Sequence, residues 1–380
     1  MAQNEGTAGD SNPPHRDSDC LQTIDSNASA TDEKVNKPSR AIASYLLRQV
    51  EEYRVLDALR KEGWSNPEGD SFFNRQRKNA DTASDKTAWY FYKLMRNIGQ
   101  ELHKATGAFT ITTQAGRTMR PLILDMCMAP GGFLSMALEQ TPEAYAVTYS
   151  LPISEGGHKV LFTPRDSLNV DQNFLDITMM AVDMGVDSKD IPKNHPDAGN
   201  FLPRQLQPNK LFDLALCDGQ VLRTHQRAPY RETREAIRLT STQLALSLEH
   251  LRPGGTMVVL LHRVEDWKNF KLLRAFYAFS SVRLFKPQAG HAKRSSFYMV
   301  ATNVQSQSAG AAQAIENWKK VWKEATFGTE EEWYEACSER DRDVDVDELL
   351  EQFGPTLISL GRSVWKVQAD ALAKAPFIRR

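Results

Sequence analysis

Cysteine is scarce, and its spacing excludes the two common uses of several cysteines. The four in this chain are Cys20, Cys127, Cys217 and Cys337. No pair has the C-x-x-C spacing of a zinc site, and four scattered thiols do not make the dense framework of a small secreted domain. We therefore expect neither a metal site nor disulfides. A reducing compartment, cytoplasm or nucleus, fits best.

Long apolar runs are missing as well. No run reaches the roughly 18 residues that a membrane span needs, and the first 40 residues hold no hydrophobic secretory core. We expect no membrane span and no secretion. The chain still has 380 residues, 41% of them hydrophobic, which is enough to bury a sizeable core in one large or two ordinary domains.

The chain has almost no net charge, −1 overall, but the two signs are segregated. Residues 203–294 contain 16 Lys or Arg against 7 Asp or Glu, whereas residues 324–351 contain 12 acids against Arg340 and Arg342. A basic region of this kind suits RNA or another phosphate-bearing partner, and the acidic region could compete with it. Two solvated faces of opposite sign packed near each other would give the same pattern.

One stretch organises the rest of the sequence. In residues 121–134 an apolar run ends in Asp125, a small-residue turn follows, and helical spacing begins at Phe133. Gly131 and Gly132 allow backbone angles closed to other residues, and the helix start offers unpaired N–H groups. This predicts a nucleotide-type cradle. The G-x-G-x-x-G fingerprint is absent, which disfavours a nicotinamide or flavin enzyme.

Residues 124–133 read Leu-Asp-x-Cys-x-Ala-Pro-Gly-Gly-Phe. This string resembles the first motif of the FtsJ-like methyltransferases, which methylate RNA ribose 2′-oxygens with S-adenosyl-L-methionine. The resemblance implies a polar role for Asp125 and a cofactor loop around it. Without the resemblance, a helix cap is the plain alternative for Asp125. The loop residues that the resemblance assigns to the cofactor are Asp125, Cys127, Ala129, Pro130, Gly131, Gly132 and Phe133.

Two further cofactor positions follow along the chain. A second strand is predicted over 144–152, and Ser150 stands where many methyltransferases have an acid for the ribose hydroxyls; Glu155 in the next loop is the alternative. A third strand is predicted over 175–182. Asp183 follows it, where the family has an adenine-contacting Asp, although a simple turn acid before Gly185 explains it equally well.

Two catalytic positions of the family are matched. Residues 87–99 have helical spacing, and Tyr92-Lys93-Leu94 resembles the family helix that carries a catalytic lysine. A lysine among aromatic residues is expected to have its pKa lowered by desolvation, while a solvated helix lysine is the plain alternative. The buried-type strand 211–217 ends at Asp218, where the family has the Asp beside the transferred methyl group.

The other two positions are not matched. In the family motif Pro-Gly-Gly-x-x-Val-Val the next residue is a second lysine, but here it is Leu260. His262, two positions later on the same strand face, is a candidate substitute base. The family's closing hairpin reads Lys-Pro, a basic loop and then Ser-x-x-Tyr-x-Val, and residues 286–300 resemble it. The family's glutamate falls at Ser296 in this hairpin. Each lost acid or base typically removes about 10²- to 10⁴-fold in rate.

Arginines follow Asp218 along a helix predicted over 229–251. Because they recur three and four residues apart, they are expected to share one face and could meet phosphates; an ion-paired surface is the alternative. They are Arg227, Arg231, Arg234 and Arg238, with Glu232 and Glu235 nearby.

The predicted organisation has four parts. Residues 1–38 form a disordered tail, 39–85 an N-terminal helical extension with a turn-rich segment from 65, 86–304 the FtsJ-like domain, and 305–380 an acidic helical extension with core tryptophans. Alternating strands and helices predict a doubly wound α/β sheet, and the resemblance adds seven strands with an antiparallel last hairpin.

Three functions compete at this stage. The resemblance and the basic region favour a methyltransferase for RNA ribose. The two unmatched positions and the neutral charge fit a methyltransferase for a small molecule or a protein. The same losses fit a protein that binds the cofactor or RNA without catalysis.

Overall fold

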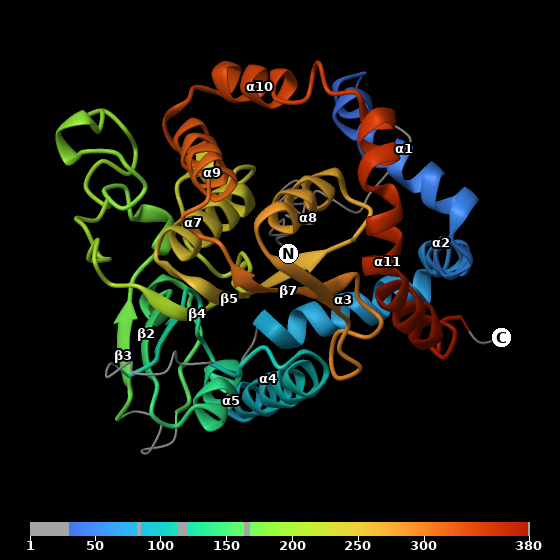
Figure 1. Cartoon of the computed structure of the whole chain (residues 1–380), viewed down its shortest axis with the longest axis horizontal. Helices are drawn as coiled ribbons and strands as arrows, with labels where there is room; N and C mark the ends of the chain where they lie inside the picture. The colour runs from blue at the N-terminus through green and yellow to red at the C-terminus, as the bar shows by residue number, and fades with distance from the viewer. Residues whose placement is uncertain (1–29, 82–84, 112–119, 163–167, 379–380) are drawn as a thin grey trace, which may run out of the picture.

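A seven-stranded sheet forms the centre of the computed structural model, which describes residues 30–81, 85–111, 120–162 and 168–378 (Figure 1). The strand order is β3-β2-β1-β4-β5-β7-β6. Strands β1 to β5 pair in parallel, and β7 runs antiparallel between β5 and β6. The predicted doubly wound sheet with an antiparallel hairpin is confirmed. The strands are β1 (Leu122–Asp125), β2 (Tyr145–Ser150), β3 (Val170–Phe174), β4 (Phe212–Cys217), β5 (Leu251–His262), β6 (Ser281–Phe285) and β7 (Ser296–Val304).

Helices cover both faces of the sheet, because alternate side chains along the buried strands point to opposite faces. Helices α4 (Asp85–Thr106) and α5 (Gly132–Gln140) lie on one face, and α7 (Glu235–Glu249), α8 (Trp267–Phe279) and α9 (Ala309–Phe327) lie on the other (Figure 1). Along β1, Ile123 packs into the core beneath α4 and α5, while Leu124 packs into the core beneath α7 and α8.

The two extensions pack against each other beside the β6 edge. Helices α1 (Ala30–Gln49) and α2 (Glu51–Trp64) lie against α11 (Val346–Leu372) (Figure 1). Tyr53 of α2 and Trp365 of α11 meet edge to face with ring centroids 5.4 Å apart. Trp365 and Trp322 of α9 are both buried, as expected for core tryptophans. Helix α10 (Glu330–Glu339) connects α9 to α11.

The structure corrects four of the expected boundaries. The third strand is 170–174 rather than 175–182, so the apolar residues after it form the 3-10 turn Ile177–Met179. The predicted turn-rich segment contains helix α3 (Pro67–Asp81). The predicted helix 39–62 is two helices, because Val50 adopts extended angles between them. Residues 1–29 of the predicted tail lie outside the described residues, whereas 30–38 are helical.

No helix among the described residues combines the length and apolar character needed to cross a bilayer.

Candidate functional site

Several of the predicted site residues lie at the carboxyl ends of the parallel strands, where open α/β sheets bind their ligands. β1 ends at Asp125 and its two neighbours end at Ser150 and Cys217. Asp218 directly follows Cys217. Because β1 pairs with both β2 and β4, Asp125, Ser150 and Asp218 occupy adjacent places on one edge.

Asp125 and Asp218 form a pair of carboxylates in a buried environment. Asp125 is 1% exposed, and one of its oxygens accepts from Cys127 N at 3.1 Å. Burial raises the pKa of Asp218 to about 7. Burial, and secondarily the charge of Asp218, hold the pKa of Asp125 well above its usual range. Two adjacent acids whose ionisation is disfavoured suit a positively charged ligand, because its charge would favour the ionised form of each.

The glycine turn between β1 and α5 is shaped by protein packing. Gly131 has φ +99° and precedes the first turn of α5. A Cβ on Gly132 would lie 2.0 Å from the carbonyl oxygen of Tyr92, so this glycine is required for α4 to approach α5. Both glycines are buried. The sequence attributed the pair to ligand approach, and the structure adds helix packing as a sufficient reason.

The segment 157–162 lies against this turn. Leu161 N donates to the carbonyl of Pro130 at 2.9 Å, and Leu161 packs against Ala88 and Tyr92 of α4. The ring of Phe162 would be 2.7 Å from a Cβ on Gly131. Phe162 therefore covers the turn that the sequence assigned to the cofactor. We call residues 157–162 the covering segment.

The acid that follows β3 is Asp176 rather than Asp183. Asp176 comes two residues after the strand and caps the next turn by accepting from Thr178 N at 2.9 Å. Asp183 is buried farther along, and its two oxygens accept from the backbone N–H groups of Gln205 and Leu206, both at 2.9 Å. The expected place of Asp183 at a strand end is therefore wrong, because the strand ends earlier.

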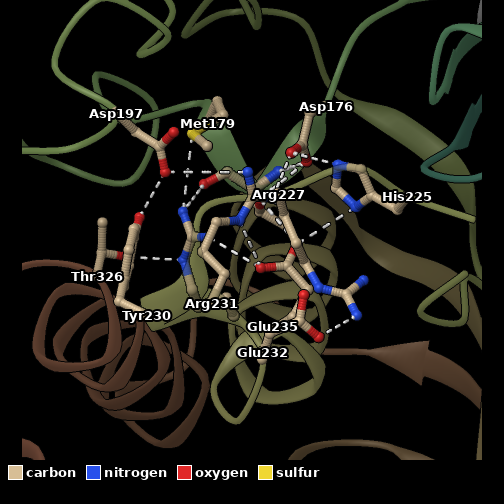
Figure 2. Close-up of polar contacts among 12 residues, drawn as sticks. Asp176, Met179, Asp197, His225, Arg227, Tyr230, Arg231, Glu232, Glu235 and Thr326 are labelled. Atoms are coloured by element: carbon tan, nitrogen blue, oxygen red, sulfur yellow. Dashed lines mark hydrogen bonds and ion pairs between the residues drawn. The ribbon is translucent and has the colours of Figure 1, made fainter. Parts of the chain in front are cut away.

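Asp176 belongs to a buried ionic network at the start of α7 (Figure 2). The guanidinium of Arg231 donates to Asp176 at 2.5 Å and to Glu235 at 2.7 Å. Burial opposes ionisation of Asp176, but the charge and hydrogen bond of Arg231, together with His225 and Thr178, outweigh it and lower the pKa of Asp176. His225 Nε2 lies 3.5 Å from Asp176 and its Nδ1 lies 4.0 Å from Glu235. Asp176, His225 and Glu235 lie close enough for a metal, but Arg231 already supplies the positive charge between the carboxylates.

The arginine row is therefore a set of internal contacts. Arg238 donates to Glu235 at 2.9 Å and to Thr326 of α9 at 3.0 Å. Arg234 donates to the carbonyl of Gly328 at 2.7 Å. Arg231, Arg234 and Arg238 are all buried. The expectation that this row meets phosphates is wrong for these three, because Arg231 pairs with Asp176 and Glu235, while Arg234 and Arg238 contact the C-terminal extension.

The loop after β4 reaches the loop after β2. Gln226 N donates to the carbonyl of Glu155 at 3.3 Å, and Thr224 Oγ1 donates to that of Gly156 at 2.8 Å. A Cβ on Gly156, whose φ is +92°, would lie 2.0 Å from the carbonyl oxygen of Thr224. Since β1 lies between β2 and β4, these two loops meet beside the end of β1 and border the site.

His262 and Ser296 face each other across β5 and β7. They are register partners, with His262 Nδ1 3.0 Å from Ser296 Oγ. His262 Nε2 lies 2.7 Å from Gln220 Oε1. Because an amide oxygen only accepts, Nε2 carries the proton and Nδ1 accepts from the serine hydroxyl. The structure thus joins the predicted substitute base to the position of the missing glutamate.

Three polar residues of the closing hairpin were missed as candidates. Lys286 is buried and its ammonium nitrogen contacts the carbonyls of Arg294 and Ser296, the latter at 2.5 Å. Burial lowers the pKa of Lys286 well below its usual range and that of His291 to about 3. Tyr298 is fully buried, and among the described atoms its hydroxyl has no hydrogen-bond partner. The sequence signal was the hairpin motif itself, which contains Lys286 and Tyr298.

Lys93 lies on the outer face of α4. Its side chain is exposed, while the neighbouring Tyr92 is buried and donates to Ser135 Oγ at 3.0 Å. The expected desolvation of Lys93 by its aromatic neighbours is therefore wrong, because the helix turns Lys93 away from its packed face. Helix α4 still adjoins the hairpin, since Glu101 accepts from the N–H groups of Gln288 and Ala289 at 2.7 and 3.1 Å.

Solved structures with a similar architecture are distant. An N-methyltransferase, NodS, from Bradyrhizobium japonicum WM9 is 15% identical, with 55% of this chain and 97% of that chain covered and a TM-score of 0.32. Human methyltransferase-like protein 13 in complex with SAH is 12% identical, covering 60% and 92%, with a TM-score of 0.31. At these TM-scores the fold assignment rests on the strand order of this chain. No curated protein sequence matches the chain.

The family comparison is more informative. The FtsJ-like methyltransferase family matches residues 100–304, which run from α4 to the end of β7. The match includes Asp125, Asp218 and the closing hairpin, and it begins after Lys93. Because it covers more than half of the 380 residues, the chain belongs to the FtsJ-like methyltransferase family and is an S-adenosylmethionine-dependent methyltransferase.

Proposed function

We propose that this chain binds S-adenosylmethionine beside Asp125 and Asp218 and methylates the ribose 2′-oxygen of an RNA. The observation that carries the binding site is the pair of adjacent acids at the ends of β1 and β4, both with raised pKa values. The cofactor carries a sulfonium and an ammonium group. Carboxylates whose ionised forms are disfavoured by burial fit such a ligand, because its positive charges favour those ionised forms.

The remaining cofactor contacts follow from the strand ends. Ser150 stands at the end of β2 with one hydroxyl for the ribose, and the first acid after β3 is Asp176. The glycine turn of residues 129–133 adjoins Asp125. Because Phe162 covers Gly131, we propose that binding displaces the ring of Phe162 from the turn.

The bound cofactor supplies an activated methyl group, so the chain's own task is to position the acceptor and to move one proton. Asp218 orients the attacking hydroxyl. Ser296 and His262 take up the proton: the serine hydroxyl already donates to His262 Nδ1, and Gln220 holds the opposite Nε2–H. Lys93 acts from the solvent side of α4 as an electrostatic partner of the acceptor.

The RNA acceptor is supported by the family, not by the arginine row, which is buried. A small molecule or a protein side chain is the second candidate acceptor. The observation that favours it is the burial of Arg231, Arg234 and Arg238, which removes the largest basic feature foreseen in the sequence.

The test is transfer of a labelled methyl group from S-adenosylmethionine to total RNA, followed by alkaline digestion. A 2′-O-methyl group blocks cleavage of the adjacent phosphodiester, so label in alkali-resistant dinucleotides supports the proposal. Asp218→Ala should abolish the label while Asp187→Ala, an exposed acid elsewhere, should retain it. Label in protein or metabolite fractions alone would exclude the RNA acceptor.

A further inference from the structure

One face of helix α4 carries two large exposed aromatic side chains between two lysines. The residues are Lys86, Trp89, Tyr90 and Lys93, and their spacing of three and four places them on one side of the helix. Trp89 is 46% and Tyr90 is 61% exposed, and both lysines are exposed as well. We call these four residues the α4 face.

Packing does not account for the aromatic pair. The opposite side of α4 is buried through Ala88, Tyr92, Ile98 and Leu102, which pack toward the sheet and the covering segment. Trp89 meets Tyr92 only edge to face, with ring centroids 5.3 Å apart, so much of its ring remains open to solvent. Trp89 and Tyr90 are thus carried by the helix but are not buried.

The chemistry of this face suits a single nucleic-acid strand. Aromatic rings stack on bases of any sequence, and lysines neutralise the phosphates between them. The sequence from residue 86 to residue 100 contains no Asp or Glu, so no carboxylate of this stretch opposes a phosphate. A protein partner would meet the aromatic pair equally well but would not need a lysine on each side of it.

Helix α4 also contacts the hairpin loop between β6 and β7. Leu94, next to Lys93, packs on Gly290, where an added Cβ would lie 3.1 Å from the leucine side chain. Gly290 precedes His291 in the hairpin loop that ends at Ser296. Helix α4 therefore adjoins the loop that leads to Ser296.

We propose that the α4 face binds the single-stranded RNA segment that flanks the methylated nucleotide. This inference rests on the proposed function for the identity of the RNA, but it concerns binding and is testable without methyl transfer. Trp89 and Tyr90 stack on two bases, and Lys86 contacts a phosphate.

The experiment measures binding of a fluorescein-labelled oligouridine to the full chain. Trp89→Ala and Tyr90→Ala should each weaken binding about fivefold or more, as expected for loss of one base stack. The matched controls are Trp64→Ala and Tyr334→Ala, whose side chains are 48% and 51% exposed on α2 and α10, and these should bind as wild type. Lys86→Ala should reduce the salt slope of log K by about 0.7.

The outcomes separate this surface from the methyltransfer proposal. Reduced RNA binding in Trp89→Ala and Tyr90→Ala, with the controls unchanged, supports the surface even if no RNA is methylated. RNA methylation by the wild type with unchanged binding in both variants would overturn the surface and leave the proposed function standing. Equal losses in the variants and in the controls would also overturn it, as would unaltered RNA binding with loss of a protein partner.

Discussion

His262 Nδ1 lies 3.0 Å from Ser296 Oγ across the antiparallel strands β5 and β7. By the resemblance of the sequence motifs, Ser296 falls at the family's glutamate position and Leu260 at that of its second lysine. We propose that the hydroxyl–imidazole pair of Ser296 and His262 takes the place of this lysine and glutamate as the proton acceptor at this edge of the sheet.

The first prediction concerns this pair. Changing Ser296 to Ala or His262 to Leu should lower kcat for methyl transfer by about 10²-fold, the effect of removing one general acid or base. Cofactor affinity should change little, because neither residue belongs to the Asp125 side of the site. Single-turnover rates and equilibrium dialysis measure the two quantities.

The control for this prediction is His250→Ala. His250 is a buried histidine at the far end of α7, with Nδ1 3.1 Å from the carbonyl of Lys210. Its loss should affect stability and leave kcat of the folded enzyme unchanged. A normal kcat in His262→Leu would show that His262 takes no proton.

The second prediction is that cofactor affinity rises with pH through neutrality. Burial raises the pKa of Asp218 to about 7 from an ordinary value of 3.8. Because the folded protein binds this proton more tightly than the unfolded chain does, protonation of Asp218 adds to the free energy of unfolding. This contribution is fully present below about pH 4 and is lost as the pH rises through 7. A cationic ligand offsets that loss only where Asp218 is ionised.

The thermal shift caused by S-adenosylmethionine should therefore be larger at pH 8 than at pH 6. Asp218→Asn should reduce this difference, since the amide does not titrate and only Asp125 of the pair still does. A wild-type thermal shift that is the same at both pH values would contradict the assigned role of Asp218.

The third prediction concerns Phe162, whose ring lies against Gly131. Phe162→Ala should speed cofactor association, because no ring has to leave the turn. Stopped-flow measurements with S-adenosylhomocysteine check the rate. Leu161→Ala is the neighbouring control, since it reduces packing on Ala88 and Tyr92 but keeps the ring. A slower association in Phe162→Ala would show that the ring belongs to the binding surface.

The fourth prediction concerns the network of Figure 2. Arg231→Met leaves Asp176 and Glu235 without their shared guanidinium, so it should lower the free energy of unfolding by about 3–5 kcal/mol, as for a broken buried pair. Urea denaturation measures the change. Arg54→Met removes an exposed pair with Glu51 and should cost less than about 1 kcal/mol. Similar losses in both variants would mean that the network contributes no more than a surface pair.

Local patterns in the sequence predicted most of the sheet. Apolar runs ending in Asp125 and Asp218 correctly marked β1 and β4, and the closing motif marked β6 and β7. The error at β3 has a physical cause. Val170–Phe174 is an edge strand with an alternating, partly polar pattern, whereas the apolar residues 175–182 pack into turns beneath α9.

Residue roles were less predictable than strands. A lysine surrounded by aromatic residues looked desolvated, but helix geometry turned Lys93 outward and Tyr92 inward. Arginines at helical spacing looked like a phosphate surface, yet Arg231 and Arg238 face the buried Glu235.

The sequence by itself determined where the buried strands β1 and β4 form and that Asp125 and Asp218 stand at their ends, because hydrophobic periodicity and turn chemistry are local. Only the tertiary structure decided which side chains meet. It placed His262 against Ser296 and Arg231 between Asp176 and Glu235, and it left Trp89 open to solvent. These outcomes depend on strand order and helix orientation, which bring together residues far apart in the chain.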